Sequence, residues 1–214
     1  MKKVGIIGSG NVGQALAQGF IDNGFEVTIA SRNAAKRVEL ENQFGHKLKA
    51  DTPENTAKSG ELIVFAVKGN QGIDALKEIG IENLNGKTVI DTTNPISNAM
   101  PVNGVLLYDS SINRSLMEDL QEKAPKANFV KAFSCVGAGS MVNPDFESKP
   151  TMFICGNNAE AKKEVTDILD KFGWETEDMG TVEAARAIEP LAILWCIPGF
   201  VKNSWNHAFK LLKK

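Results

Sequence analysis

The chain contains few of the residues that most often build disulfides or metal sites. Its 214 residues include three cysteines and two histidines. Cys135, Cys155 and Cys196 are odd in number and show no C-x-x-C spacing, which argues against a disulfide framework and against a zinc site. We therefore expect no metal site, and a reducing, cytoplasmic compartment suits the unpaired thiols.

Side chains for acid–base catalysis are equally scarce. Tyr108 is the only tyrosine, and Ile112 stands four residues after it, so the Tyr-x-x-x-Lys pair of the short-chain dehydrogenases is absent. His46 and His207 lie in polar segments that we expect to be exposed, which favours surface positions over catalysis for both. The sequence identifies no catalytic residue.

Strong charge and long apolar runs are also missing. The formal net charge is −2, which provides no basic surface for nucleic acid. No segment approaches the ~20 apolar residues that span a membrane. After Met1-Lys2-Lys3 glycines interrupt the apolar run at once, unlike a signal peptide. With 43% hydrophobic and 23% charged residues, the composition is that of a globular protein. We expect neither nucleic acid nor a membrane as a partner.

Glycine, in contrast, occurs at an informative spacing near the start of the chain. Gly8, Gly10 and Gly13 form a G-x-G-x-x-G pattern between the apolar run 4–7 and the helix-forming segment 14–20. In this context the pattern predicts a dinucleotide site, with the pyrophosphate at the helix N-terminus. A glycine turn without a ligand is the alternative, which the strand and helix on either side disfavour. The predicted contacts are Gly8, Ser9, Gly10, Asn11, Val12 and Gly13.

The end of the second predicted strand, 25–30, indicates which nucleotide is bound. NAD enzymes place Asp or Glu there to accept hydrogen bonds from the ribose. This chain has Ser31-Arg32-Asn33 instead, with Lys36 one turn into the next helix. A hydroxyl, a guanidinium and an ammonium attract a 2′-phosphate, so NADP(H) is favoured over NAD. A solvated basic loop is the alternative reading.

Strand and helix patterns alternate along the rest of the chain. We expect helices at 33–44, 52–58, 73–79, 111–123 and 159–172, and strands at 47–50, 61–67, 87–92, 128–133, 151–155 and 175–179. Residues 181–213 are predicted to be helical, with interruptions at Pro190 and Pro198. The alternation predicts an α/β fold with a Rossmann-type doubly wound, mostly parallel sheet. Residues 1–147 would form the NADP-binding domain, and 148–214 a C-terminal strand–helix extension that completes the sheet. We expect the two parts to form one compact unit, because no low-complexity linker separates them.

Ligands of such sheets lie beyond the carboxyl ends of the strands, where the strand order reverses. Val67 and Lys68 are expected to border the two riboses, and Asn94-Pro95 to flank the nicotinamide. For Asn94, an Asx-turn or a helix cap is an equal alternative. The small residues Gly137 and Ala138 leave room for a flat ring on the nicotinamide, unless they only mark a loop.

These features together resemble the deazaflavin-dependent NADP oxidoreductase family. The resemblance is carried by Gly8–Gly13, Ser31-Arg32 with Lys36, Val67-Lys68, Lys131-Ala132-Phe133 and the loop after it, Phe153–Asn157, and Ala185–Leu191. It implies an NADP site in which Ser31, Arg32 and Lys36 hold the 2′-phosphate. It also implies a planar deazaflavin or flavin co-substrate near Asn94-Pro95 and 136–138. Members are commonly homodimers, and the apolar segment 191–197 would suit an inter-subunit patch or, equally, an intramolecular core helix.

The predicted function is hydride transfer between NADPH and a small planar redox acceptor. Two rings in contact need no side-chain acid, so catalysis would rest on proximity and on the cofactor. One alternative is a β-hydroxyacid dehydrogenase-like enzyme, because Lys202 and Asn206 stand at i, i+4 on a predicted helix, although that family continues into a long helical domain. Another alternative is a non-catalytic NADP(H) sensor.

Overall fold

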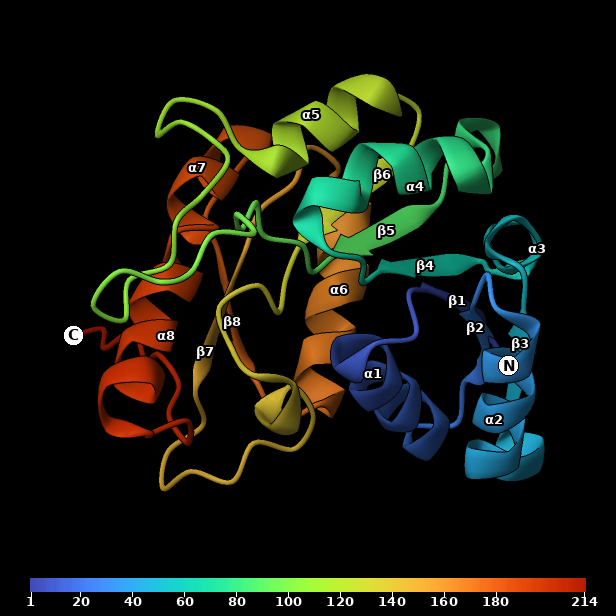
Figure 1. The fold of residues 1–214 in the computed structure, drawn as a ribbon, viewed down its shortest axis with the longest axis horizontal. Coiled ribbons are helices and arrows are strands. Elements are labelled where there is room, and N and C mark those ends of the chain that lie inside the picture. Colours follow the sequence, from blue (N-terminus) through green and yellow to red (C-terminus); the bar gives the residue numbers. More distant parts are fainter.

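Six parallel strands form the central sheet of the computed structural model, which describes residues 1–214 (Figure 1). The strand order is β3-β2-β1-β4-β5-β6. The strands are β1 (Lys3–Ile7), β2 (Glu26–Ala30), β3 (Leu48–Asp51), β4 (Leu62–Phe65), β5 (Thr88–Asp91) and β6 (Asn128–Lys131). The chain builds outward from β1 in one direction and then from β4 in the other, so the order reverses between these two strands. The predicted Rossmann-type α/β fold is confirmed.

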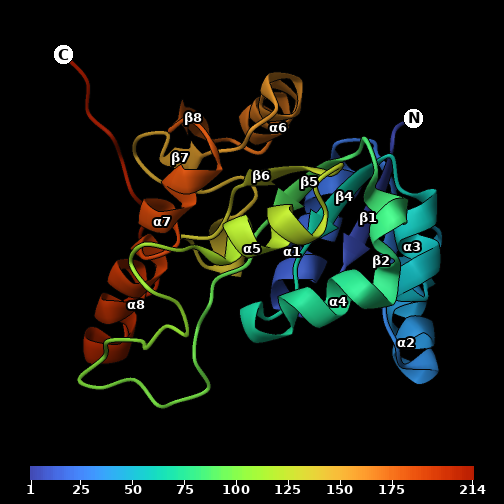
Figure 2. The same cartoon turned by 90° about the horizontal axis from the view of Figure 1, so that it is seen from above.

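Helices cover both faces of this sheet, and each face has its own hydrophobic core. The unbroken apolar run of β4 is fully buried because alternate side chains enter the two cores, Val64 on one face and Ile63 on the other. The first core contains residues of α1 (Asn11–Asp22), α2 (Ala34–Phe44) and α6 (Ala159–Lys171). The second contains residues of α3 (Pro53–Ser59), α4 (Gly72–Ile79), α5 (Leu116–Lys123) and α7 (Ala185–Ile188). Figure 2 shows α6 on one side of the strands and α4 and α5 on the other.

Side-chain caps explain where several of these helices begin. Asn33 accepts hydrogen bonds from the backbone N–H groups of Ala35 and Lys36 at the start of α2. Thr52 precedes Pro53, which needs no N–H partner at the first helical position, and caps α3. Ser115 and Glu118 form a capping box at the start of α5. These local signals lie in the sequence itself, and the helices were predicted within a few residues of their true bounds.

The C-terminal extension differs from the prediction in one respect. Strands β7 (Thr151–Ile154) and β8 (Glu175–Asp178) do not complete the large sheet but pair with each other as a separate two-stranded parallel sheet. A single antiparallel bridge, between Lys131 and Cys155, joins β7 to β6. Helix α6 packs against β6 and β8, so residues of both segments share the first hydrophobic core.

The predicted helix over residues 181–213 is too long. Helix α8 (Leu191–Lys202) continues through Pro198 and ends where Asn203 adopts a left-handed conformation, with φ of 51°. Residues 203–214 then run without helix beside β7, where the N–H of Thr151 donates to the carbonyl oxygen of Phe209. The tail leaves the helix because it forms these contacts instead.

One helical stretch is long and apolar enough to cross a membrane by length and composition alone. It runs from Val182 to Lys202, which corrects the expectation that no segment reaches that length. A third of its most apolar part is buried inside the protein. Within it, Glu189 is also buried and binds the backbone of α5, so this stretch packs on the domain.

Candidate dinucleotide-binding site

The glycine turn between β1 and α1 has a different requirement at each of its three glycines. Gly8 has a φ of +122°, which disfavours any residue with a Cβ. A Cβ at Gly13 would overlap the carbonyl oxygen of Gly8, so this position needs glycine for the turn to close on the helix. At Gly10 a Cβ would meet no protein atom within 4 Å. The fold therefore explains Gly8 and Gly13, whereas the open side of Gly10 is free for a ligand.

A cavity of about 600 Å³, here called the glycine-turn cavity, opens from this turn. It is lined by residues that follow β1, β2 and β4 and by one face of α4. Eight predicted contacts line it: Gly8, Ser9, Gly10, Ser31, Arg32, Asn33, Val67 and Lys68. Helix α1 begins directly after this turn, and the free N–H groups and the dipole at its N-terminus favour an anion there.

The basic residues after β2 are arranged differently from one another. The Arg32 side chain is 71% exposed, and its Nε lies 3.8 Å from Oε2 of Glu78 on α4. Ser31 is buried, and its carbonyl oxygen accepts a hydrogen bond of 2.8 Å from Arg37. Lys36 does not line the cavity and pairs with Glu39 at 2.6 Å. Of the two cations predicted to bind the 2′-phosphate, Arg32 is thus the one that lines the cavity, and a role for Lys36 needs its side chain to exchange partners.

Sequence analysis missed two carboxylates on the opposite wall. Asp74 and Glu78 lie on one face of α4 and line the glycine-turn cavity. Their i, i+4 spacing was visible in the sequence, but nothing local indicated that α4 faces the end of β2. Because Glu78 is near Arg32, it offsets part of the positive charge that a 2′-phosphate would meet.

A second cavity of about 360 Å³, here called the β4–β5 cavity, lies beyond the ends of those two strands. Val67 and Lys68 line both cavities, so the two are contiguous. Val12 and Asn94 also line the second one. Asn70 and Asn98 close it on one side, with a hydrogen bond of 3.1 Å between their amides.

Asn94 is held by a long-range contact rather than by a turn or cap of its own. Its Nδ2 donates to the carbonyl oxygen of Ser134 at 2.7 Å. Its Oδ1 is buried and has no hydrogen-bond partner. A buried amide oxygen without a partner is costly, and a ligand donor in the adjoining cavity would satisfy it. Because Asn94 lines the β4–β5 cavity, this oxygen is a candidate for contact with a ligand there.

Six of the predicted contacts line neither cavity: Asn11, Gly13, Lys36, Pro95, Gly137 and Ala138. The loop that contains Gly137 does accommodate a flat ring, but the ring belongs to the chain itself. The indole of Trp195 on α8 packs so closely on Gly137 that a Cβ there would lie 2.6 Å from it. The structure therefore assigns Gly137 to packing against α8.

The residues of the hydroxyacid alternative and the two histidines line neither cavity. Helix α8 ends at Lys202, so Asn206 does not share a helix face with it, and the Lys-x-x-x-Asn pair is not formed as predicted. His46 is exposed, as predicted. His207 is half-buried instead, because its ring stacks on Trp195 with 5.0 Å between centroids.

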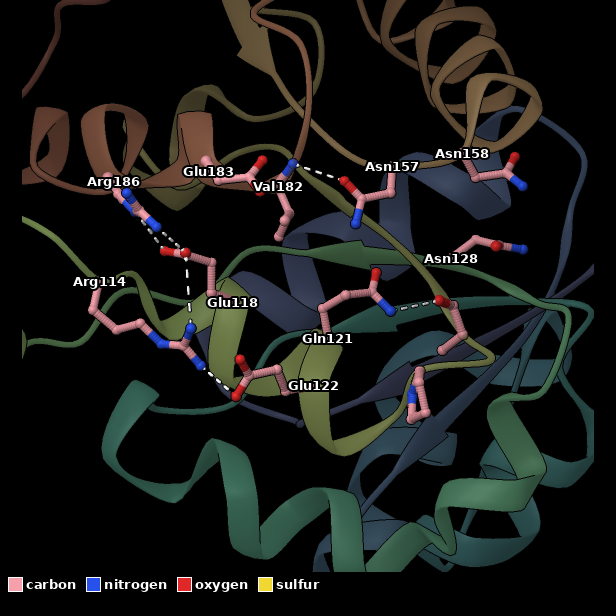
Figure 3. Close-up of a pocket in the computed structure, with 12 residues that line it drawn as sticks. Arg114, Glu118, Gln121, Glu122, Asn128, Asn157, Asn158, Val182, Glu183 and Arg186 are labelled. Carbon is pink, nitrogen blue, oxygen red and sulfur yellow. Dashed lines mark hydrogen bonds and ion pairs between the residues drawn. The ribbon is translucent and has the colours of Figure 1, made fainter.

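A third cavity, of about 670 Å³, lies between α5, α7 and the start of β6, and Figure 3 shows its lining. It is a polar cleft in which the charged groups are already paired. Arg186 contacts Glu118 at 2.5 Å, and Arg114 contacts Glu122 at 2.5 Å. The Arg186 hydrogen bond lowers the pKa of Glu118 to about 2. Because Asn128 begins β6, this cleft lies at the amino ends of the strands, away from the glycine turn.

Comparison with known proteins supports the dinucleotide site. The family described as NADP oxidoreductase coenzyme F420-dependent matches residues 3–95. The F420-dependent NADP reductase of Methanocaldococcus jannaschii is 27% identical over 206 residues, which cover 90% of each chain. A crystal structure of a candidate F420-dependent NADP reductase from Arthrobacter sp. FB24 superposes with a TM-score of 0.91, at 30% identity and with complete coverage of both chains.

A longer relative shares the same region. The metalloreductase STEAP3 of Rattus norvegicus is 29% identical over 200 residues, which cover 92% of this chain and 38% of the relative. The chain thus spans about two fifths of the length of the curated metalloreductases that it matches.

Proposed function

The chain belongs to the F420-dependent NADP oxidoreductase family, and we propose that it transfers a hydride between NADPH and a planar, deazaflavin- or flavin-like acceptor. That it is an NADP-dependent oxidoreductase follows from the family. The proposal concerns the identity of the acceptor and the way in which the cofactor is held. The proposal rests mainly on one observation: the two cavities join at Val67 and Lys68 and so offer one continuous path from the glycine turn to the end of β5.

The residues along this path suit the parts of NADP(H) in order. The amides at the start of α1 would bind the pyrophosphate, and the open side of Gly10 leaves room for it. Ser31 and Arg32 would bind the 2′-phosphate, because no carboxylate ends β2. In the β4–β5 cavity, Oδ1 of Asn94 would accept a hydrogen bond from the nicotinamide carboxamide. Bound NADPH supplies the hydride, and these residues bind and orient it.

The lining of the β4–β5 cavity offers few side chains that could donate a proton to an acceptor. It includes amides, hydroxyls, apolar side chains and the ammonium of Lys68, but no histidine, tyrosine or carboxylate. Reduction of a carbonyl requires a proton at the oxygen, and in this lining only the ammonium of Lys68 could provide it. Transfer between two flat rings instead depends on their contact and orientation.

A panel of acceptors tests this proposal. NADPH oxidation is followed at saturating NADPH with a deazaflavin, a flavin, a quinone, a ferric chelate and a β-ketoacid. We expect turnover with a planar ring acceptor, and unchanged turnover in the Lys202→Ala variant. Turnover only with the ketoacid, lost in Lys202→Ala, would establish the hydroxyacid alternative. Tight NADPH binding without turnover on any acceptor would establish the sensor alternative.

We also propose that the protein forms a homodimer through α8 and the neighbouring arm of residues 96–113. These two segments lie side by side in both views (Figures 1 and 2), and Gly104 of the arm packs against Val201. Both carry large apolar side chains in the open, among them Met100 and Ile112 on the arm and Leu194 and Val201 on α8. A second copy of the same surface would cover them.

Light scattering after size exclusion tests the dimer. The wild type is expected at twice the chain mass, and Val201→Asp is expected to shift it to the monomer, because a charge is costly in an apolar interface. Glu26→Lys on the exposed start of β2 provides a charge-changing control away from the surface. A monomeric wild type would exclude this interface.

A further inference from the structure

Lys131, at the end of β6, is fully buried, and its ammonium contacts three oxygens from distant parts of the chain. It lies 2.7 Å from Oδ2 of Asp91 and 2.9 Å from Oε1 of Glu189. It also donates a hydrogen bond of 2.8 Å to the carbonyl oxygen of Thr93. Lysine is almost never fully buried without such partners. We call Asp91, Lys131 and Glu189 the buried triad.

Both carboxylates of the buried triad also accept hydrogen bonds from donors other than Lys131. Oδ1 of Asp91 accepts from the N–H of Thr93 at 2.9 Å and from its hydroxyl at 2.7 Å. The Glu189 carboxylate accepts from the N–H groups of Leu116 and Met117, both at 3.0 Å, at the start of α5. Burial lowers the pKa of Lys131, but the two carboxylates more than compensate and raise it above its usual value. The ammonium is therefore charged.

Thr93 is the residue through which this triad reaches the β4–β5 cavity. Its N–H, its hydroxyl and its carbonyl oxygen are all bound by the triad, and Thr93 itself lines the cavity. The next residue is Asn94, whose Nδ2 is bound by Ser134 and whose Oδ1 is free. The backbone that carries the free oxygen is thus fixed from the protein interior.

The other side of this contact is also constrained. Phe133, between Lys131 and Ser134, is buried and has a φ of +61°, which is strained for a residue with a side chain. Phe133 directly precedes Ser134, whose carbonyl oxygen accepts the hydrogen bond from Asn94. A buried ion cluster is a poor source of stability, because apolar side chains of similar volume often serve as well. Its location behind the cavity wall indicates a role in geometry.

We infer that Lys131 is a positioning residue, which fixes the carbonyl of Thr93 and thereby aims Oδ1 of Asn94 into the β4–β5 cavity to bind the nicotinamide carboxamide. The inference rests on the proposed function for the placement of the nicotinamide. The inference goes beyond the proposed function because it assigns the orientation of the nicotinamide ring to Lys131, a side chain that touches neither cofactor nor acceptor.

Two ligands that differ only at the nicotinamide end test the inference. NADP⁺ and 2′-phospho-ADP-ribose share the adenosine and the pyrophosphate, so the ratio of their affinities isolates the contacts of the nicotinamide. Calorimetry measures both affinities for the wild type and for Lys131→Met, which keeps an unbranched side chain one atom shorter and removes the charge. Lys131→Met is expected to lose about three- to tenfold in NADP⁺ affinity, the range for one hydrogen bond, with 2′-phospho-ADP-ribose unchanged.

Two more variants distinguish a selective loss of nicotinamide binding from a general loss of stability. Lys131→Met combined with Asp91→Asn removes opposite charges together, so it leaves less uncompensated charge in the interior and should show the same selective loss. Val165→Ala, in the core under α6, lowers thermal stability without touching the buried triad and should leave the affinity ratio unchanged. If both variants at Lys131 keep the wild-type ratio, the inference is overturned. If the wild type itself binds the two ligands equally, the proposed placement of the nicotinamide fails first, and the inference with it.

Discussion

Replacement of Gly10 by alanine should separate ligand binding from folding, because the protein and the ligand impose different requirements at this position. Gly10 has φ of −77° and ψ of −173°, a conformation open to any residue. An added Cβ meets nothing within 4 Å. Lower entropy of the unfolded chain would stabilise the variant by about 0.4–1 kcal/mol. Alanine is a poorer N-cap than glycine, which costs roughly 0.5–1 kcal/mol. The free energy of unfolding should change by less than about 1 kcal/mol.

The effect on NADPH should be much larger. The methyl group of the variant projects into the space where the pyrophosphate has to approach the amides at the start of α1. An extra methyl group in a close-packed contact typically costs about 1–3 kcal/mol. The corresponding loss of NADPH affinity is roughly 5- to 150-fold.

Titration by NADPH fluorescence and thermal unfolding, on the same samples, measure the two effects. Gly139→Ala is the matched control: Gly139 is also open, with nothing within 4 Å of an added Cβ, but lines neither cavity. Its NADPH affinity should stay at the wild-type value, and its free energy of unfolding should again change by no more than about 1 kcal/mol. Gly13→Ala is the opposite control, because its Cβ overlaps the Gly8 carbonyl oxygen and should lower stability as well as binding. A folded Gly10→Ala variant with wild-type affinity would refute the placement of the pyrophosphate.

Three further substitutions test the charged residues of the glycine-turn cavity and the ion pair between Arg186 and Glu118. Arg32→Ala should weaken NADPH about 10- to 150-fold by loss of a charge-assisted hydrogen bond and leave NADH unchanged in parallel fluorescence titrations; equal losses would contradict a 2′-phosphate contact. Glu78→Gln should tighten NADPH by no more than about fivefold, since its ion pair with Arg32 is largely exposed, and the gain should fade with added salt. The pKa of Glu118 is lowered to about 2 in the folded state, mainly by its hydrogen bond with Arg186. This pairing therefore stabilises the protein at pH values above the pKa of Glu118 in the unfolded chain, and the stabilisation is lost as the pH falls toward 2. Arg186→Met should therefore flatten the fall in melting temperature on acidification; an unchanged acid slope would show that this pair does not contribute.

Local signals made most of the fold predictable. The apolar run of β4, the glycine turn and the caps at Asn33 and Thr52 each act over fewer than ten residues, so the sequence displays them directly. The same holds for the candidate contacts that follow β1, β2 and β4, since strand ends in a parallel sheet meet at one edge. Ten of the sixteen predicted contacts line one of the two cavities.

The parts that were missed depend on contacts between distant segments. Asp91, Lys131 and Glu189 are up to 98 residues apart in the chain, and nothing near any of them predicts that their side chains meet. Trp195 lies on Gly137 for the same kind of reason, so small residues predicted to receive a ligand ring receive an indole instead. The tail after Lys202 looked helical by composition, but its backbone pairs with β7.

The two ends of the proposed cofactor path are built in opposite ways, and this has a kinetic consequence. At the 2′-phosphate end, Arg32 is exposed and loosely paired, so it can adjust to the ligand and supplies mainly binding energy. At the nicotinamide end, Asn94 is fixed by Ser134 and by the buried triad, so it supplies mainly orientation. Binding energy that is the same in the ground state and the transition state changes KM, whereas orientation of the reacting ring changes kcat. Substitutions at Arg32 should therefore act through KM for NADPH alone, whereas those at Lys131 should lower kcat at saturating NADPH in addition to losing about three- to tenfold in affinity. An Arg32 variant with a lower kcat and an unchanged KM would show that the two ends are coupled rather than separate.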